Sequence, residues 1–267
     1  MNEPRWAVMC LAASTVYGAC KGLTWYTAVR VDVPGWRQAA YLLVWPGMDA
    51  DAFLSSRRLK AGCPATEWLS GLRNVGLGAT LLFVAAPAVD VLDPYVLGWI
   101  GMIGLVLGFH FGALHLLSCL WRQFSVEARP VMNRPLASAS LGEFWGRRWN
   151  TAFRDLTHRF LFRPLAYRFG PRPAALAGFI VSGIVHDFVI SWPAGGGYGG
   201  PTLFFTVQGL AVNIERSARG RRLGLGRGVA GRLFAAVVLV APLGLLFHRP
   251  FVLHVIIPLM HAIGALS

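Results

Sequence analysis

The sequence predicts an all-α integral membrane protein. Of its 267 residues, 55% are hydrophobic and only 14% are charged, and the mean hydropathy is +0.52. A soluble domain of this length could not hide so much apolar surface. The apolar residues also gather into runs near the roughly 20 residues that a helix needs to cross a bilayer. These observations predict one membrane-embedded domain over residues 1–267, with about seven transmembrane helices and additional re-entrant or interfacial amphipathic helices.

Seven apolar runs are the candidates for crossing helices. The first, 6–29, carries Lys21 as its only charge, and it continues beyond Cys20, which favours a membrane helix over a cleaved signal peptide. The others are 74–92, 95–121, 174–192, 202–214, 233–247 and 251–266, with the last two expected to form a hairpin turned at 248–250. Residues 41–54 hold an apolar stretch too short to span and broken by Pro46 and Gly47, so we expect a re-entrant or interfacial segment there.

The net charge of +13 comes almost wholly from arginine. In a soluble protein this balance would suggest a nucleic-acid partner, but here the cations lie between apolar runs and indicate anionic lipid headgroups instead. They concentrate in loops 57–73, 122–172 and 216–232, whereas turns 93–94 and 193–200 have none. The positive-inside rule then predicts cytoplasmic basic loops and an external N-terminus, in a membrane of the bacterial inner-membrane type. If 41–54 crossed fully, the count would become eight and the N-terminus would move inside.

Residues 144–150 read Phe-Trp-Gly-Arg-Arg-Trp-Asn, an unusual density of aromatic and cationic side chains. At helical spacing, residues 141–160 separate into two faces, which predicts an amphipathic helix at the membrane surface. The apolar stripe comprises Leu141, Trp145, Trp149, Ala152, Leu156 and Phe160. The polar stripe comprises Glu143, Arg147, Asn150, Arg154 and His158.

His186 lies 36 residues beyond Asn150, twelve residues into the run 174–192 and therefore roughly 18 Å deep. An ionisable side chain at this depth is a candidate for function, and the alternative is a structural histidine bonded across helices. Gly178, Ser182 and Gly183 share its helix face, and such small residues let another helix approach closely.

The segments FWGRRWN at 144–150 and SGIVHD at 182–187 together resemble the wax-synthase branch of the membrane-bound O-acyltransferases. The resemblance is strongest over about 132–187, with a weaker echo at 45–49. It implies a reactive Asn150 and a catalytic His186 within a membrane helix. It also implies an enzyme that esterifies a hydrophobic alcohol or lipid hydroxyl with an acyl thioester, acyl-CoA.

The chemistry of such a transfer fits these residues. A neutral imidazole at His186 can take the hydroxyl proton, and the Asn150 amide can stabilise the oxyanion of the thioester carbonyl. Arg147 and Arg148 are expected to grip coenzyme A phosphates, with lipid phosphates as the alternative. The other residues expected to contact substrate are Trp145, Trp149 and Asp187, the last also a candidate to orient His186. We expect no metal and no cofactor beyond the co-substrate acyl-CoA; the partners are acyl-CoA, the alcohol acceptor and the bilayer, without nucleic acid.

Two other functions remain open from the sequence. A transporter or lipid-binding scaffold is compatible with broken segments at 41–54 and 195–205. The other is a haem protein. His110 and His115 lie about 140° apart around a helix, and His254 and His261 lie about 10 Å apart along one, so neither pair could bind one metal ion together. A haem iron would therefore need single axial histidine ligands on separate helices. The cysteines at 10, 20, 63 and 119 lack CxxC spacing, so they are interpreted as small buried hydrophobes and not as disulfides or a zinc site.

Overall fold

The computed structural model describes residues 3–28, 33–55, 62–88 and 93–266, and these residues form helices without any strand. The all-α class is therefore confirmed for the described chain. Five helical runs are long and apolar enough to cross a membrane: Arg5–Tyr26, Ala65–Ala88, Pro94–Gln123, Pro171–Ala194 and Gly228–Leu246. They correspond to the expected spans at 6–29, 74–92, 95–121, 174–192 and 233–247, although the second begins earlier. The cations expected at 57, 58 and 60 lie outside the described residues.

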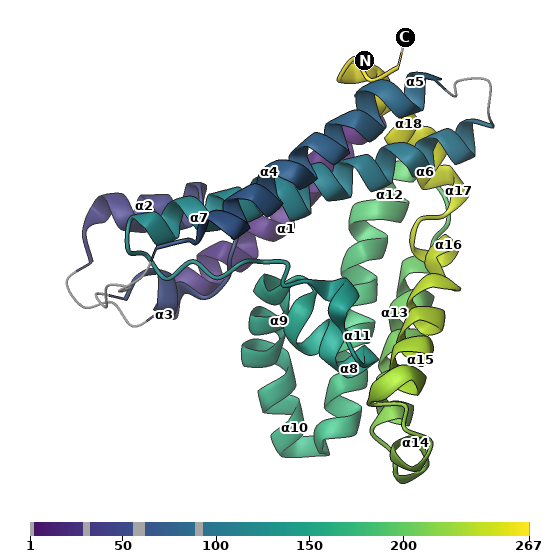
Figure 1. Ribbon diagram of the computed structural model, residues 1–267. Coiled ribbons are helices and arrows are strands. Elements are labelled where there is room, and N and C mark those ends of the chain that lie inside the picture. Colours follow the sequence, from purple (N-terminus) through teal and green to yellow (C-terminus); the bar gives the residue numbers. More distant parts are fainter. Residues whose placement is uncertain (1–2, 29–32, 56–61, 89–92, 267) are drawn as a thin grey trace. The chain divides into compact units, whose positions relative to one another are not determined.

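The two remaining expected spans differ from the prediction. Residues 202–214 belong to α13 (Gly200–Glu215), a helix of only 16 residues. The expected hairpin at 248–250 does not form, because α17 (Arg249–Phe251) continues in the direction of α15 (Gly228–Val240) and does not turn back along it (Figure 1). The physical reason is local: Nδ1 of His248 accepts a hydrogen bond from Phe251 N (3.2 Å) and so caps a new helix.

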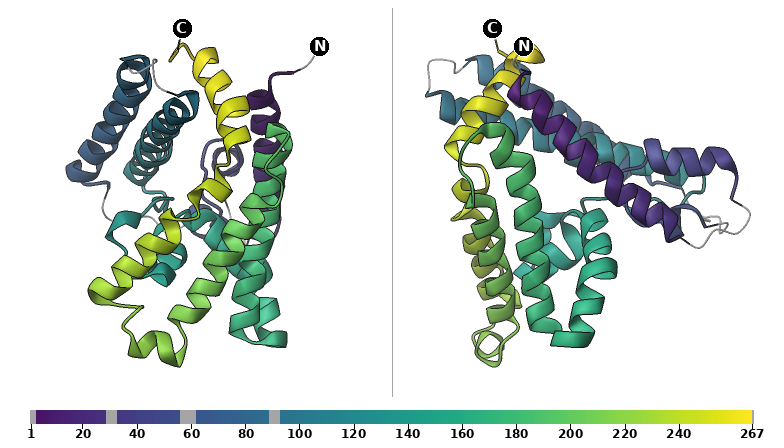
Figure 2. Two further views of the ribbon diagram at one scale, coloured as in Figure 1. Left: turned by 90° about the vertical axis from the view of Figure 1, so that its right-hand side faces the viewer. Right: turned by 180° about the vertical axis from the view of Figure 1, so that it is seen from behind.

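The chain separates into two compact units. The first comprises Met1–Ala13, Arg134–Trp149 and Thr157–Leu259, and the second comprises Ser14–Asn133, Asn150–Leu156 and Met260–Ser267. The first unit is built on α11 (Pro171–His186), which lies beside α13 (Figure 2). The helices approach closely at Gly183, where an added Cβ would stand 2.6 Å from Thr202 Cα. The prediction of close helix packing at the small face of α11 is thus confirmed at this residue.

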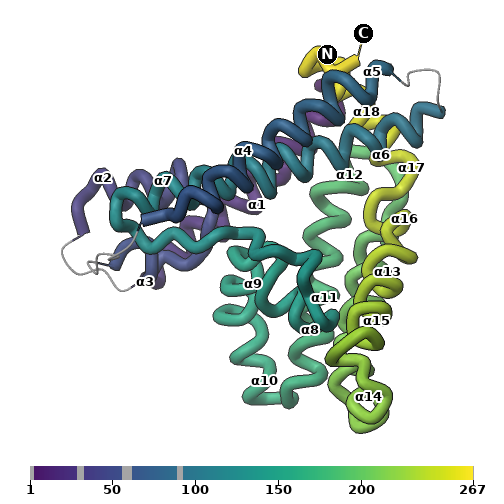
Figure 3. Tube along the Cα trace, viewed as in Figure 1, coloured from purple at the N-terminus to yellow at the C-terminus, as the bar shows by residue number. Residues whose placement is uncertain are grey.

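The second unit places α4 (Ala65–Thr80) beside a long run formed by α6 (Pro94–Leu105), η2 (Val106–Ala113) and α7 (Leu114–Gln123) (Figure 3). Gly78 meets the backbone of Gly104 and Gly108 at this contact. The same packing brings Cys63 and Cys119 together as a disulfide. The sequence interpretation of these two cysteines as unbonded hydrophobes is therefore wrong, since 56 residues separate them and only the helix pairing joins them.

The segment 41–54 forms no spanning helix, as expected. It joins the end of α2 (Gly35–Leu43) to α3 (Ala50–Phe53) through irregular backbone. Polar side chains of α1 (Arg5–Tyr26) serve that backbone: Tyr17 Oη donates to Trp45 O (2.9 Å), and the buried Lys21 Nζ donates to Gly47 O. Irregular backbone at membrane depth needs such partners, because lipid offers none.

We expect Lys21→Met to lower the free energy of unfolding by about 1–3 kcal/mol, because it leaves Gly47 O buried without its donor. Thermal unfolding of the purified protein in detergent measures the change. Leu23→Met, on the same helix but at a 43% exposed side chain, is the control and should be neutral. Equal unfolding temperatures for the two variants would show that the Lys21 contact contributes nothing.

Candidate active site

The helix expected over 141–160 is interrupted at the end of the aromatic motif. α8 (Leu141–Glu143) and η4 (Phe144–Arg148) are followed by Trp149 in extended backbone, with φ −96° and ψ 129°. Asn150 then has φ +41°, and α9 (Thr151–Thr157) begins after it. Asn150 therefore does not continue a helical row of cations, and the predicted polar stripe is wrong from this residue onward.

Asn150 suits this break for two reasons. Asparagine adopts the left-handed region more readily than most residues. Its Oδ1 also accepts a hydrogen bond from Phe153 N (3.4 Å), in the manner of a helix N-cap. Its backbone N–H points to Met132 Sδ (3.3 Å), and Thr151 N donates to Val131 O (2.9 Å). Because Oδ1 accepts from the backbone, the Nδ2 group is left as the donor that Asn150 can offer a ligand, and no described residue accepts from it.

The first half of the motif is held by α13. The carboxylate of Glu215, only 5% exposed, accepts from Leu141 N (2.7 Å) and Gly142 N (3.1 Å) at the start of α8. Two helical turns earlier on α13, Gln208 Oε1 accepts from Trp145 Nε1 (3.2 Å). Neither α13 residue was among the site residues predicted from the sequence. Their signal was present as two polar side chains, seven residues apart, on one face of an apolar helix.

The two motif arginines have different surroundings. Arg148 is an ion-pair partner of Glu143, with Nη2 2.6 Å from Oε1, and its Nη1 donates to Arg134 O (3.3 Å). The N–H of Ala139 and the Arg148 guanidinium both favour the ionised carboxylate and lower the pKa of Glu143. Arg147, by contrast, is exposed and forms no ion pair with a described residue. Only Arg147 thus presents its full guanidinium to a ligand.

The aromatic members of the motif pack on one another and on α13. Trp149 stacks on Phe144 with ring centroids 5.4 Å apart. The Trp145 ring lies 5.6 Å from Phe205 and 5.7 Å from Phe179. Gln208 and the rings of Phe205 and Phe179 thereby hold Trp145, which positions the motif, whereas Trp149 stacks on Phe144.

His186, at the end of α11, has one ring nitrogen engaged. Nδ1 lies 2.6 Å from Ser182 O. A carbonyl oxygen only accepts, so Nδ1 carries the proton of the neutral ring and Nε2 holds the lone pair. The ring packs against Phe205, with centroids 4.4 Å apart, and no described group hydrogen-bonds to Nε2. The lone pair on Nε2 can therefore accept a proton from a ligand.

The Asp187 carboxylate accepts hydrogen bonds at the start of α13. Its Oδ1 accepts from Ser191 Oγ (2.8 Å) and Gly199 N (2.9 Å), and its Oδ2 accepts from Thr202 N (3.1 Å) and from the Thr202 hydroxyl. Four hydrogen bonds fill the carboxylate. Its observed partners are therefore on the 191–202 connection, and none of them is His186.

The same network reaches His248, which the sequence analysis had interpreted only as part of a turn. Since Nδ1 accepts from Phe251 N, the neutral ring carries its proton on Nε2, which donates to Ser191 Oγ (3.1 Å). Burial lowers the pKa of His248 and favours this neutral form. His248, Ser191 and Asp187 thus form one chain of donors that ends on the carboxylate.

Comparison with known proteins finds similarity to acyltransferases in the part of the chain that holds the motif. Residues 128–207, which include Asn150 and His186, match the model of the membrane bound O-acyl transferase family. The chain is 31% identical over 148 residues to a long-chain-alcohol O-fatty-acyltransferase of Simmondsia chinensis, covering 48% of this chain and 40% of that one. It is 30% identical over 174 residues to probable long-chain-alcohol O-fatty-acyltransferase 1 of Arabidopsis thaliana, covering 57% and 47%.

A third relative is named for a sterol acceptor. The acyl-CoA–sterol O-acyltransferase 1 of Arabidopsis thaliana is 35% identical over 71 residues, covering 24% of this chain and 21% of that one. The matched part therefore spans less than half the length of each of these relatives. No solved structure matches the chain.

Proposed function

We propose that the chain is a multi-pass membrane enzyme of the membrane-bound O-acyltransferase family, similar to its wax-synthase branch, and that it esterifies a hydrophobic alcohol or lipid hydroxyl with acyl-CoA. The observation that carries the proposal is the state of His186. Its Nδ1–H is tied to Ser182 O, so Nε2 is available to take a proton. The long-chain-alcohol and sterol acyltransferases among the relatives support the two acceptor classes.

In the proposed reaction, Nε2 of His186 removes the proton of the acceptor hydroxyl as its oxygen attacks the thioester carbonyl carbon. The carbonyl oxygen becomes an oxyanion, and Nδ2 of Asn150 donates a hydrogen bond to it. Collapse of the intermediate breaks the carbon–sulfur bond, and the imidazolium returns its proton to the departing coenzyme A thiolate. The products are the ester and coenzyme A. A site within the bilayer would exclude water as a competing acceptor.

The remaining motif residues divide between binding and positioning. Arg147 is proposed to bind the coenzyme A phosphates at the cytoplasmic side, because it is the exposed arginine of the pair. Trp149 is proposed to contact substrate. Arg148, Trp145 and Asp187 instead position the motif and the start of α13 through the contacts described above. The proposed reaction calls on no cofactor beyond acyl-CoA and on no catalytic metal.

We expect His186→Ala to reduce ester formation by ~10²–10⁴-fold, because it removes the base. Asn150→Ala should cost roughly 10²–10³-fold, and the double variant should be little worse than the poorer single one, because residues that act as one unit are not additive. The assay incubates membranes with labelled acyl-CoA and a panel of alcohols, sterols and lipid hydroxyls. The exposed His261→Ala is the matched control and should remain active. A variant of His186 that keeps more than a tenth of the activity would refute its role, and lipid binding without turnover in the wild type would favour a transporter or scaffold.

The two arginines should respond differently to the same change. Arg147→Gln is expected to raise the Michaelis constant for acyl-CoA and to spare both that for the alcohol and thermal stability. Arg148→Gln is expected to lower the unfolding temperature, because it leaves Glu143 without its ion-pair partner. Steady-state kinetics and thermal unfolding of both variants make the comparison. An unchanged acyl-CoA constant in Arg147→Gln, with weaker membrane association, would favour lipid phosphates as its ligand.

In the proposed topology, the protein is one acyltransferase domain in a bacterial-type inner membrane, and its basic loops face the cytoplasm. The predicted count of about seven crossings requires α13 and residues 249–262 to cross in addition to the five longer runs. α16 (Leu243–Leu246) lies between α15 and α17, and the chain does not turn back there, so whether 249–262 crosses decides the count (Figure 1).

Exposed side chains give suitable sites for testing this orientation. In a background with Cys10 and Cys20 replaced by serine, an impermeant maleimide should label Tyr198→Cys in intact cells. Leu136→Cys and Leu223→Cys, at side chains that are 98% and 68% exposed, should react only after permeabilisation. Labelling of either basic-loop cysteine in intact cells would reverse the proposed sidedness.

A further inference from the structure

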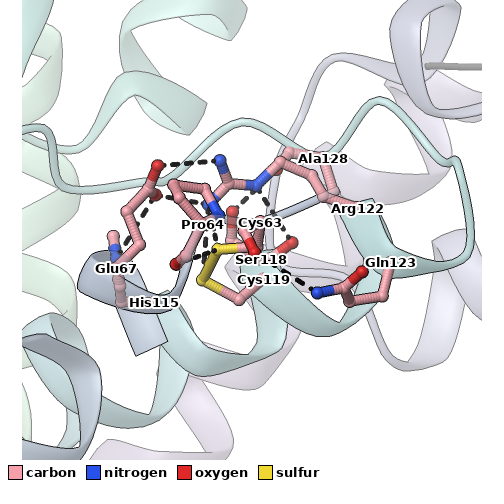
Figure 4. Close-up of a disulfide and its surroundings, with 9 residues drawn as sticks. All are labelled: Cys63, Pro64, Glu67, His115, Ser118, Cys119, Arg122, Gln123 and Ala128. Atoms are coloured by element: carbon pink, nitrogen blue, oxygen red, sulfur yellow. Dashed lines mark hydrogen bonds and ion pairs between the residues drawn. A yellow bond between two sulfur atoms is a disulfide. The ribbon is translucent and has the colours of Figure 1, made fainter. Parts of the chain in front are cut away.

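In the second unit, the start of α4 and the residues before it face α7, and three residues with metal-ligand side chains meet there, with His115 beside one of them (Figure 4). Cys63 lies two residues before α4, Glu67 lies in the first turn of α4, and His115 and Cys119 lie four residues apart on α7. On a helix, residues four apart share a face. Both Sγ atoms and a carboxylate oxygen of Glu67 lie within 4.8 Å of one another, and His115 Nε2 lies 3.5 Å from Glu67 Oε2.

The Cys63–Cys119 disulfide accounts for only half of this arrangement. It joins the two sulfur atoms, whereas the Glu67 carboxylate lies within 4.8 Å of both sulfurs and the His115 imidazole contacts that carboxylate. Helical proteins build metal sites from side chains on facing helices. Here α7 supplies one pair, and α4 with the residue two positions before it supplies the other. This arrangement suggests a second, reduced state of the cluster, in which both sulfurs are thiolates and can bind a metal ion.

We propose that the reduced form of this cluster binds one Zn²⁺ through Cys63, Glu67, His115 and Cys119. Zinc takes four tetrahedral ligands at about 2.3 Å for sulfur and about 2.0–2.2 Å for nitrogen or oxygen, which places neighbouring ligand atoms about 3.3–3.8 Å apart. The 3.5 Å between His115 Nε2 and Glu67 Oε2 has the length of such an edge. Thiolate and imidazole ligands favour zinc over magnesium or calcium.

Arg122 supplies the charge that this site needs. Its Nη2 lies 3.2 Å from Cys63 Sγ and 3.4 Å from Cys119 Sγ, and its guanidinium pairs with both oxygens of Glu67. Two thiolates, one carboxylate and Zn²⁺ leave a net charge of about −1, which one guanidinium neutralises. Neutralisation matters because the sulfurs are buried, with Cys63 6% and Cys119 0% exposed. Arg122 would thus support the ligands from outside the coordination shell.

The two states interconvert by balanced chemistry. Two equivalents of a thiol reductant give two electrons and two protons to the disulfide, forming two cysteine thiols and one oxidised thiol pair. Zinc binding then releases the two protons. Under the proposed topology, loops 57–73 and 122–172 face the cytoplasm, where thiols are kept reduced. In either state the cluster joins α4 to α7, so the metal has a structural role apart from the acyl transfer.

Zinc content of the whole protein tests the proposal without any acyltransferase assay. Wild type is purified in detergent with a phosphine reductant and equimolar zinc, freed of unbound metal by gel filtration, and analysed by plasma mass spectrometry. We expect one zinc per chain. Cys63→Ser and Cys119→Ser should lose it, and Glu67→Gln and His115→Ala should bind zinc at least ~10-fold more weakly. Cys10→Ser and Cys20→Ser remove the free cysteines and should keep the full content.

A measurement on wild type alone covers the case in which a cysteine variant fails to fold. Chelation of zinc should expose two further thiols per chain to a maleimide, and zinc should raise the unfolding temperature of the reduced protein. Reduced wild type that retains no zinc, or zinc that survives Cys63→Ser, would overturn the proposal. Because no substrate is present, failure of the zinc site and failure of the acyltransferase proposal are distinguishable.

Discussion

The carboxylate of Asp187 accepts hydrogen bonds from Gly199 N and Thr202 N at the start of α13, and the geometry of the first unit depends on this contact. It fixes where α13 begins after the glycine-rich connection. At the far end of the same helix, Glu215 receives the backbone N–H groups that open the aromatic motif. One helix therefore sets the positions of the motif and, through Phe205, of the His186 ring. Unmet buried backbone groups are costly, so the buried contacts of Glu215 are strong constraints.

In the second unit, different residues provide hydrogen-bond partners for irregular backbone. Tyr17 and Lys21 on α1 satisfy the carbonyls of Trp45 and Gly47, in a segment that forms no long helix. Around Asn150, the Met132 sulfur accepts from Asn150 N and the Val131 carbonyl accepts from Thr151 N. Polar residues within apolar runs are thus mainly partners of irregular backbone. This explains why several ionisable groups lie in a chain of such high hydropathy without each being part of the chemistry.

The candidate site residues divide in the same way into those that hold the backbone in place and those that can act on a substrate. Asp187 and Arg148 have filled hydrogen-bonding capacity or an ion-pair partner, so their contribution is positional. His186 Nε2, Asn150 Nδ2 and the Arg147 guanidinium are the groups that remain free to act on a ligand. Asn150 lies in the second unit and His186 in the first, each held by contacts within its own unit. The proposed division of labour follows from these local environments.

The sequence by itself determined the class of the protein, most of its long apolar helices and the identities of its candidate catalytic residues. Hydropathy runs and the positions of Asn150 and His186 are local properties, which can be read along the chain. Only the tertiary structure decided the break at Trp149 and Asn150, because a left-handed residue and a cap override helical periodicity. It also decided the partners of Trp145 on α13 and the joining of Cys63 to Cys119. Trp145 and Gln208 are separated by 63 positions in the sequence, and Cys63 and Cys119 by 56. No short-range sequence pattern encodes such a pairing, because it exists only once the helices have packed.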